Sequence, residues 1–300
     1  MRMNKRYRNE TNDLHDGEEF HCRHGMDSDW SIGPLHMHPH YEFYLFVQGN
    51  AQILIEDESF DAQPMDLFIY PPGVLHRALI KDHTVPYERA YCYITRKALA
   101  DMSDDRFPML QILESAMSRG DYSYHVDDEN AGSFLRLLDE WIRDASSEDP
   151  FSRSMNRYRI NMLSLITCKI VQRKDVITPR PPDRMSNIIR YINDHLLEPL
   201  PLESLAERFY LSKYTLLHDF KSYANISVHQ FILQKRILYA QELMRNGIKP
   251  GDAAGQSGFT DYAGFYRAFI RYNAVTPQAY FAGVRLQTDA DGQPAFVSAR

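Results

Sequence analysis

The chain has 300 residues, of which 44% are hydrophobic and 25% are charged, and its net charge is −6. This size suits two or three folded parts, and the composition excludes a disordered or fibrous protein. No stretch approaches the roughly 20 apolar residues that span a bilayer, and the polar N-terminus lacks the apolar run of a signal peptide. We therefore expect a cytoplasmic protein with no membrane partner. The odd number and wide spacing of Cys22, Cys92 and Cys168 indicate reduced thiols.

The region from Trp30 to Tyr93 is predicted to form strands. The runs YEFYLFV, AQILIE, DLFIYP and ERAYCYI are short, rich in aromatic and β-branched residues, and separated by Gly, Pro, Asn or Asp. Several such strands at close spacing predict a small sandwich or barrel. We assign residues 1–103 to this β domain.

Residues 104–176 are predicted to form a helical middle section, because FLRLLDEWI and YRINMLSLITCKIV place apolar residues at helical spacing. The apolar faces within 134–142 and 160–171 would pair two chains in a homodimer, or would pack against the chain's own β domain. The three prolines of ITPRPPD, at 177–183, cannot continue a helix and predict a joint between domains. The remaining residues, 177–300 with a core at 184–284, are predicted to be helical, so the fold class is α+β.

Two motifs after the joint share one design. In the first, the short helix PLESLAERF is followed by a turn, and Ser212 opens the helix KYTLLHDFKSYA. In the second, KPGDAAGQS precedes the turn at 258–260, and Asp261 opens YAGFYRAFIRY. Ser and Asp are good N-caps because a side-chain oxygen accepts a hydrogen bond from a free backbone N–H of the next turn. Each motif therefore predicts a helix-turn-helix with a projecting second helix, and a long helix over 228–246 would join the two.

The stretch from Leu202 to Phe281 closely resembles the DNA-binding domain of the AraC family of transcription regulators. The resemblance is carried, in order along the chain, by Ser212, Phe220-Lys221, Arg236 with Ala240, Gly258-Phe259-x-Asp261, Phe265, Phe269 and Thr276-Pro277. It implies a sequence-specific regulator rather than an enzyme, with double-stranded DNA as its partner and both recognition helices in successive major grooves. Residues 183–285 hold 12 basic and nine acidic residues, so this part is mildly basic within an acidic chain, which permits DNA binding.

The position of each residue on the second helices predicts its role. The bases would face Tyr214, Leu217 and His218 in the first motif, and Tyr262, Ala263, Tyr266 and Arg267 in the second. Arg267 is the best candidate for direct readout, because a guanidinium group binds guanine O6 and N7 together. Phosphates would bind Lys213, Lys221 and Arg271. The alternative for each cation is a solvated surface charge.

Departures from the family pattern concern backbone conformation. Asn225 and Asn273 stand where the family usually has Gly, and Asn tolerates the left-handed conformation expected there. Gly255 and Gly264 lie inside predicted helices, where each costs about 1 kcal/mol relative to Ala. We therefore expect the second motif to be the less rigid of the two.

The β domain carries a second constellation. His36, His38 and Glu42 have the spacing H-x-H-x-x-x-E, and His76 follows a P-x-G-x-x run. Placed on a strand, His36 and His38 would point to one face. Residues 30–95 resemble the two cupin motifs, and a cupin-like sensor domain commonly precedes an AraC-type DNA-binding domain. Met65 stands where the second motif usually has Gly. Two further histidines, His40 and His83, are predicted to lie at the surface.

The resemblance leaves two interpretations of this domain open. Metal-dependent cupins bind a divalent metal at the positions of His36, His38, Glu42 and His76, a donor set that suits Mn, Fe, Ni, Cu or Zn. A metal-dependent dioxygenase or isomerase is therefore the alternative function. In regulators such histidines often serve the fold, and no metal is required.

A regulator would instead bind a small-molecule effector in the barrel, for which a carbohydrate is our expectation. Aromatic faces with a few polar groups suit such a ligand, although plain core packing is the alternative. The expected ligand-binding residues are His36, His38, Glu42, Tyr44, Tyr70, His76 and Tyr91, with Phe46 and Tyr93 beside them and Trp30 at the mouth. Effector binding would shift the balance between two domain arrangements, and RNA polymerase would be a further partner of an activator.

Overall fold

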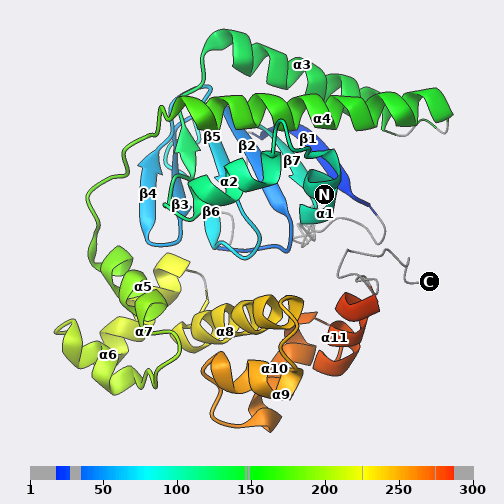
Figure 1. Ribbon diagram of the computed structural model, residues 1–300. Coiled ribbons are helices and arrows are strands. Elements are labelled where there is room, and N and C mark those ends of the chain that lie inside the picture. The colour runs from blue at the N-terminus through cyan, green and yellow to red at the C-terminus, as the bar shows by residue number, and fades with distance from the viewer. Residues whose placement is uncertain are drawn as a thin grey trace, which may run out of the picture. The chain divides into compact units, whose positions relative to one another are not determined.

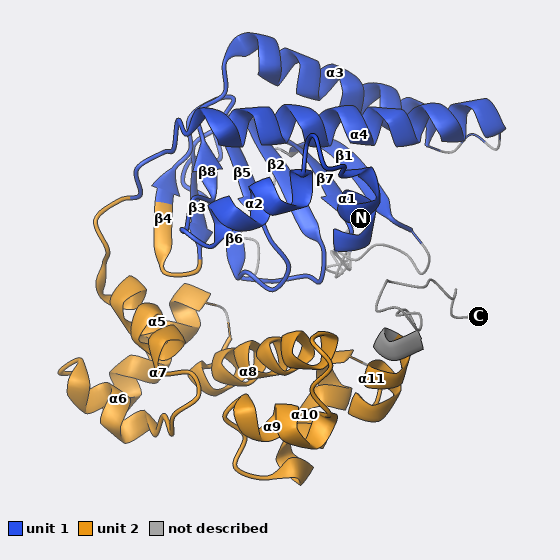
Figure 2. Cartoon of the chain, viewed as in Figure 1, with its two compact units in different colours: residues 1–55, 60–179 blue, residues 56–59, 180–300 orange. Residues whose placement is uncertain are grey.

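The computed structural model describes residues 18–27, 35–145, 147, 149–224, 226–273 and 275–286. The chain divides into two compact units (Figure 2). The N-terminal unit comprises residues 1–55 and 60–179, and the C-terminal unit comprises residues 56–59 and 180–300. The predicted helical section lies in the N-terminal unit, as does the predicted β domain apart from residues 56–59.

Two sheets form the centre of the N-terminal unit (Figure 1). The larger sheet is antiparallel throughout and has the order β1 (Phe20–Asp27), β7 (Tyr87–Ile94), β2 (Tyr41–Gln48), β5 (Leu67–Tyr70) and β8 (Ser123–Tyr124). The smaller sheet has the order β4 (Glu58–Asp61), β3 (Ala51–Ile55) and β6 (His76–Ile80). The strands predicted from the sequence are thus confirmed.

Strand β2 shows why both faces of the larger sheet are buried. Successive side chains of a strand point to opposite faces. Tyr41, Phe43 and Leu45 belong to one apolar cluster, and Tyr44 and Phe46 belong to another, which also contains β3 and β6 residues of the smaller sheet. The second cluster is the interior between the sheets, which we call the sensor interior.

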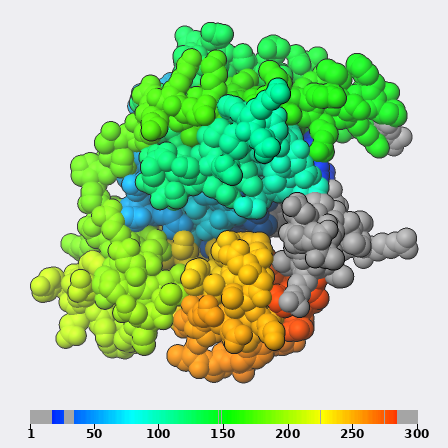
Figure 3. Space-filling view, in the orientation of Figure 1, coloured from blue at the N-terminus to red at the C-terminus, as the bar shows by residue number. Residues whose placement is uncertain are grey.

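Four helices cover the other face of the larger sheet: α1 (Arg96–Met102), α2 (Met109–Met117), α3 (Asp128–Asp144) and α4 (Pro150–Arg173). Phe134 and Trp141 of α3 and Ile160 and Leu163 of α4 are buried in one cluster with the sheet. In the space-filling view the teal and green side chains of these helices hide most of the blue strands (Figure 3). The apolar faces within 134–142 and 160–171 therefore pack mainly against the chain's own sheet.

The sequence spacing of the cysteines concealed one close pair. Cys22 of β1 lies directly opposite Cys92 of β7, and both thiols are buried and reduced, as is Cys168. Burial, together with the neighbouring Cys92, raises the pKa of the Cys22 thiol well above its usual value. A buried thiol with a raised pKa is a poor nucleophile, so Cys22 serves the core.

The C-terminal unit is helical: α5 (Arg184–Asp194), α6 (Leu202–Arg208), α7 (Lys213–Ala224), α8 (Val228–Arg245), α9 (Pro250–Gln256), α10 (Tyr262–Asn273) and α11 (Pro277–Leu286). Helices α6 and α7 form the first motif, α9 and α10 form the second, and α8 joins them (Figure 1). Phe220 of α7 packs edge-on against Phe231 of α8 at 5.5 Å. Phe265 and Phe269 of α10 are buried with Ala240 of α8. Among the described residues, no helix combines the length and apolar character needed to cross a membrane.

Candidate nucleic-acid interface and sensor interior

Both recognition helices begin at the predicted N-caps. Ser212 Oγ accepts a hydrogen bond from the backbone N–H of Thr215 at 3.0 Å, and Asp261 Oδ1 accepts one from Gly264 at 2.6 Å. Helices α7 and α10 bury the apolar side chains of Leu216, Phe220, Phe265 and Phe269. Because the apolar faces are fixed on α8 and on neighbouring helices, the opposite faces project from the unit.

The structure places the predicted DNA contacts on these projecting faces. Tyr214 is 78% exposed, Tyr262 is 45% exposed and Tyr266 is 38% exposed, whereas Leu217 is half-buried. The other members of the predicted set are all exposed: Lys213, His218, Lys221, Ala263, Arg267 and Arg271. Their individual roles toward bases or phosphates stay predictions.

The cations of the two motifs differ in their surroundings. Lys213 Nζ donates to the Glu203 carboxylate, and His218 Nδ1 lies 3.1 Å from Asp219 Oδ1. Within the part of the chain that the structure describes, Arg267 and Arg271 have neither a hydrogen-bond nor an ion-pair partner. The second motif therefore presents guanidinium groups that are available to an external anion.

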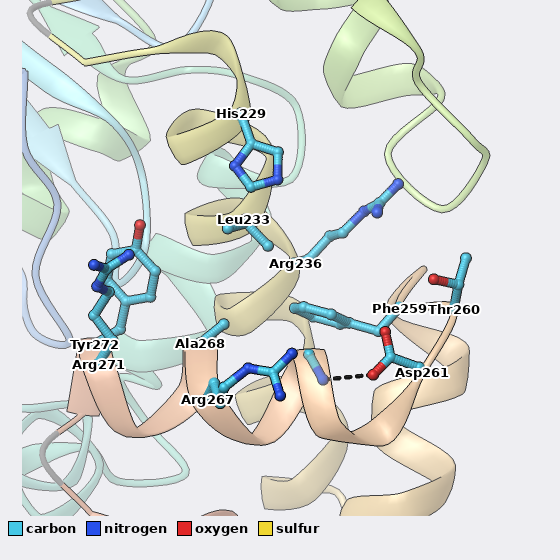
Figure 4. Close-up of a pocket in the computed structure, with 11 residues that line it drawn as sticks. His229, Leu233, Arg236, Phe259, Thr260, Asp261, Arg267, Ala268, Arg271 and Tyr272 are labelled. Atoms are coloured by element: carbon cyan, nitrogen blue, oxygen red, sulfur yellow. Dashed lines mark hydrogen bonds between the residues drawn. The ribbon is translucent and has the colours of Figure 1, made fainter.

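A groove of about 590 Å³ runs along the side of α10 that faces α8 (Figure 4). Arg267 and Arg271 extend from α10 into it, and His229 reaches it from α8 (Figure 4). Asp261 also lines the groove, but one of its oxygens is engaged in capping α10. Arg236 also lines the groove, but it is bonded to the carbonyls of Leu196 and Glu198. The other three basic side chains suit a phosphate of the DNA backbone.

In the sensor interior, the predicted histidines gather around Glu42. His36 and His76 exchange two backbone hydrogen bonds, of 3.1 and 2.9 Å. His38 Nε2 lies 2.9 Å from Glu42 Oε2, and His76 Nε2 lies 3.2 Å from the same oxygen. His36 and His38 do not share a strand, because His36 forms an isolated bridge and His38 lies in the irregular segment before β2. Their ring centroids still lie 6.2 Å apart.

Hydrogen bonds on the far side of two rings fix their orientation. The backbone carbonyl of His40 accepts from His38 Nδ1 at 2.8 Å, and that of Val74 accepts from His76 Nδ1 at 2.9 Å. A carbonyl oxygen only accepts, so each Nδ1 carries the hydrogen, and a neutral ring then has its lone pair on Nε2. Both Nε2 atoms thus point at the same carboxylate oxygen, which favours a proton or a cation between them.

Burial and hydrogen bonding shift the ionisation of this cluster. Burial alone would raise the pKa of the Glu42 carboxyl, but the neighbouring His38 and His76 imidazoles hold that pKa well below its usual value. Burial lowers the pKa of the His76 imidazole. The carboxylate is therefore ionised, and His76 favours its neutral form.

Three of the four predicted metal ligands are close enough to share one ion. One donor atom each from His36, Glu42 and His76 lies within 4.8 Å of the others. His38 is outside this set. Two imidazoles and one carboxylate are the donor set of many open first-row transition-metal sites.

Both halves of the chain match known families. Residues 19–156 match the AraC-like ligand binding domain, and residues 205–283 match a helix-turn-helix domain. The chain belongs to the AraC family of transcription regulators. This AraC-type regulator is a DNA-binding protein with an N-terminal ligand-binding domain, as the sequence predicted.

Several known proteins are similar to it over most of their length. An HTH-type transcriptional regulator of Bacillus subtilis is 24% identical over 242 residues, which cover 76% of this chain and 79% of that protein. The arabinose operon regulatory protein of Salmonella typhimurium is 23% identical over 246 residues, with 81% and 84% covered. A crystal structure of the DNA-binding domain of AdpA in complex with a target DNA is 29% identical, covers 35% of this chain and 96% of its own, and gives a TM-score of 0.34.

The sensor interior of this AraC-type regulator holds the expected ligand-binding residues. His38, Glu42, Tyr44, Tyr70, His76 and Tyr91 are buried, as are Phe46 and Tyr93, and His36 is half-buried. Trp30 lies outside the described residues. The prediction of a surface position is confirmed for His83 but wrong for His40, which is 2% exposed and stacks on the His38 ring at 4.2 Å.

The sequence interpretation missed two interior residues of β7. The hydroxyl of Tyr87 is hydrogen-bonded to that of Tyr44, and the Arg89 guanidinium lies 5.2 Å from the Tyr87 ring centroid. The signal was present, because Tyr87, Arg89, Tyr91 and Tyr93 alternate with period two in YERAYCYI and so share one face.

Backbone conformation also corrects the expectations drawn from missing glycines. Met65 has a φ of 69°, so it adopts the left-handed conformation that a Gly would favour. The same conformation was expected of Asn273, but this residue is the last of α10 and does not have a positive φ. Its side chain donates a hydrogen bond to the Phe269 carbonyl at 3.0 Å. Asn225 lies outside the described residues. Tyr210, which had drawn no such expectation, has a φ of 54°.

Proposed function

We propose that α7 and α10 bind two successive major grooves of an operator, and that a small polar molecule bound in the sensor interior controls this binding. The DNA contacts are supported by the unpartnered Arg267 and Arg271 on the same helix as exposed Tyr262 and Tyr266. Recognition helices held about 34 Å apart would meet one face of a duplex.

Selection of duplexes from a random library with the full-length protein tests this assignment. Footprinting of a selected duplex should show two protected segments about one helical turn apart. Arg267→Ala should remove protection from one segment, and Tyr214→Ala should remove it from the other. The exposed Arg184 of α5 gives a matched control, and its Arg184→Ala variant should protect both segments. Failure of the folded protein to select any sequence would contradict the assignment.

The effector of this proposal is a carbohydrate. The sensor interior combines tyrosine and histidine rings with one buried carboxylate, and such a mixture binds the apolar faces and hydroxyl groups of sugars. A similar protein is named for the arabinose operon. A ligand changes DNA affinity only through different affinities for two states of the protein, so the sugar should alter both thermal stability and operator binding.

A panel of pentoses and hexoses, followed by thermal unfolding and by operator affinity, tests the effector. We expect one sugar to raise Tm and to change operator affinity. Tyr91→Phe, which removes one inward hydroxyl, should weaken both effects, whereas Tyr158→Phe on the exposed face of α4 should not. If fatty acids or other apolar ligands shift Tm and no sugar does, the carbohydrate assignment is wrong.

A metal-binding role is the second candidate, favoured by the geometry around Glu42. The Nε2 atoms of His38 and His76 both approach one oxygen of Glu42, and the Nδ1 atom of each ring is hydrogen-bonded to a backbone carbonyl. Metal-bound histidines usually make such a hydrogen bond through the ring nitrogen that does not bind the metal. His36, Glu42 and His76 would hold the ion, which would either complete the sensor or supply Lewis-acid chemistry to a cupin-type dioxygenase or isomerase.

Titration of the full-length protein with Zn²⁺, Mn²⁺, Fe²⁺, Ni²⁺ and Cu²⁺ tests this candidate. One equivalent should bind, and Glu42→Gln and His36→Gln should each abolish binding while His83→Gln, at the surface, should not. Turnover that needs the metal and is lost in His38→Ala would favour the enzyme, whereas a metal that changes only operator affinity would favour sensing. If no metal binds at micromolar concentration, both the metal-dependent enzyme and the metal-dependent sensor are excluded.

A homodimer is proposed through α4. Phe151, Tyr158 and Met162 are 70%, 68% and 49% exposed, and their spacing of seven and four residues places them on one face of the helix. A dimer would present four recognition helices to DNA. Tyr158→Glu should give a monomer in analytical ultracentrifugation, whereas Arg153→Glu, on another face of α4, should leave the dimer intact.

We propose that this regulator acts in the cytoplasm, where it would contact RNA polymerase if it activates transcription. Transcription in vitro from a promoter that carries the selected duplex distinguishes activation from repression. A rise in transcript would support contact with the polymerase, and a fall would indicate repression.

A further inference from the structure

Three segments of the C-terminal unit meet at Arg236. This residue of α8 donates its Nε–H to the carbonyl of Leu196 at 2.9 Å and an Nη2–H to the carbonyl of Glu198 at 2.7 Å. Both carbonyls lie in the loop between α5 and α6, directly before the first motif. Figure 4 shows Arg236 extending from α8 toward this pale-green loop, away from Arg267 and Arg271.

Gly258, in the turn of the second motif, packs against the same contact between Arg236 and the loop. Its φ is 83°, and a Cβ added there would lie 2.9 Å from Arg236 Nε, 3.1 Å from the Leu196 carbonyl oxygen and 3.1 Å from Leu197 Cα. Two of these three neighbours are backbone atoms, which cannot rotate aside. The second motif therefore packs directly against the loop of the first motif, with the guanidinium of α8 beside it.

We infer that this contact, which we call the Arg236 junction, fixes the distance and rotation between the two recognition helices and so sets the operator spacing that the protein accepts. The inference rests on the proposed binding of α7 and α10 to successive grooves. Arg236 touches no base in this assignment, so it is a positioning residue.

The geometry of the junction explains why it controls orientation. Phe220 joins the first motif to α8 at Phe231, and Phe269 joins the second motif to α8 near Ala240, so each motif contacts its own part of the linking helix. Such apolar contacts permit small rotations, because they lack directional bonds. A planar guanidinium with two donors to two carbonyls of one loop restrains both distance and angle, which a lysine ammonium cannot do.

A spacing series tests the junction. The probe is a duplex that the full-length wild-type protein selects from a random library, remade with one base pair inserted or removed between its two protected segments. One base pair moves the segments by about 3.4 Å and rotates them by roughly 35° relative to each other. We expect the wild type to lose about tenfold or more in affinity on the altered duplexes, comparable to a mismatched base pair.

Two variants should weaken the preference for the original spacing. One changes the junction on α8, and the other changes it at the turn of the second motif. Arg236→Gln removes the two donors, and Gly258→Ala forces the loop and the turn apart. Each should bind the original duplex more weakly and should discriminate the altered duplexes by less than about threefold. Arg236→Lys, which keeps the charge, should be intermediate. Arg245→Gln on the same helix, whose partners are Glu242 and Tyr280, should keep the wild-type ratio.

The ratio between duplexes is the decisive readout, because a general loss of stability lowers both affinities equally. A folded Arg236→Gln or Gly258→Ala protein that keeps the wild-type ratio would overturn the inference, and either variant suffices if the other does not fold. If the wild type selects no duplex at all, the proposed DNA contacts fail before the spacing is measured.

Discussion

The two helix-turn-helix motifs share one backbone plan but differ in how they use charge. In the first, Lys213 is bonded to Glu203 and His218 lies beside Asp219. In the second, Arg267 and Arg271 have no partner among the described residues. Arg267 and Arg271 can therefore release counterions from DNA without first breaking an internal pair, as can the exposed Lys221 of the first motif, whereas Lys213 must first leave Glu203. We therefore expect equivalent elements of one fold to contribute different terms to DNA affinity.

The turns of the two motifs give a second contrast. Tyr210 and Gly258 each follow the residue that caps the first helix of their motif, and both have positive φ values, of 54° and 83°. Gly258 is packed against backbone atoms, whereas Tyr210 is 97% exposed. Both turns need a residue in the left-handed conformation. Glycine, which favours this conformation, occupies the position only in the second motif, where no side chain would fit.

The largest expected effect concerns the free arginines. Arg267→Ala should weaken operator binding by about 1–3 kcal/mol, because a guanidinium in contact with a guanine or a phosphate is lost. Removing both Arg267 and Arg271 should reduce the slope of log affinity against log salt concentration by about two, whereas Lys213→Ala should change it by less than one. Fluorescence anisotropy between 50 and 200 mM NaCl (about the range in which such slopes are measured) gives the values. An equal slope change for Lys213→Ala would remove the contrast between the motifs.

The next effect concerns the turn of the first motif. Tyr210→Gly should raise the free energy of unfolding by about 1 kcal/mol, because glycine adopts the left-handed conformation without a steric cost. Tyr239→Gly, in the middle of α8, is the control and should lower it by a similar amount. Urea unfolding of the full-length protein measures both. Destabilisation by Tyr210→Gly would show that its ring makes contacts that outweigh the strain.

A smaller gain is expected in the first helix of the second motif. Gly255 has a negative φ and no atom within 4 Å of an added Cβ, so Gly255→Ala should stabilise the protein by about 0.5–1 kcal/mol. Gly258→Ala, three residues further along, should destabilise it. Urea midpoints of the two variants test this opposition, and a shift in the same direction for both would contradict it.

The smallest effect concerns the paired lysine. Glu203→Gln should raise operator affinity by about twofold, since an exposed ion pair is weak and Lys213 then becomes available to a phosphate. Glu207→Gln removes the same charge from the same helix and controls for simple loss of repulsion. The Lys213 pair also lowers the pKa of the Glu203 carboxyl, so the pair persists at neutral pH. Equal gains for both variants would show that pairing is irrelevant.

The helix-turn-helix pair was largely predictable because its signals are local. The N-caps Ser212 and Asp261, the inward Phe220 and Phe265, and the exposure of Arg267 all follow from the 3.6-residue period and from capping chemistry. Each depends on residues within a few positions of itself. The partners of these side chains were not predictable, since the Glu203–Lys213 pair and the Arg236 junction connect different helices.

The sensor interior was predicted in composition but not in arrangement. The resemblance to the cupin motifs selected Glu42 and His76, and the aromatic faces that suit a small ligand selected Tyr44 and Tyr91. The burial of His40 and the exclusion of His38 from the set of possible metal donors depend on an irregular segment, which no period describes. The Cys22–Cys92 pair likewise depends on the register between β1 and β7, because the two cysteines are 70 residues apart in the sequence.

The sequence by itself determined the family, the two DNA-binding motifs and the faces that point toward solvent or core, because periodicity, caps and turn residues act over a few bonds. Only the tertiary structure decided which arginines are free, which histidines converge on Glu42, and how Arg236 joins the two motifs. Those contacts depend on where distant segments come to lie, and that is set by the packing of the whole unit rather than by any local pattern.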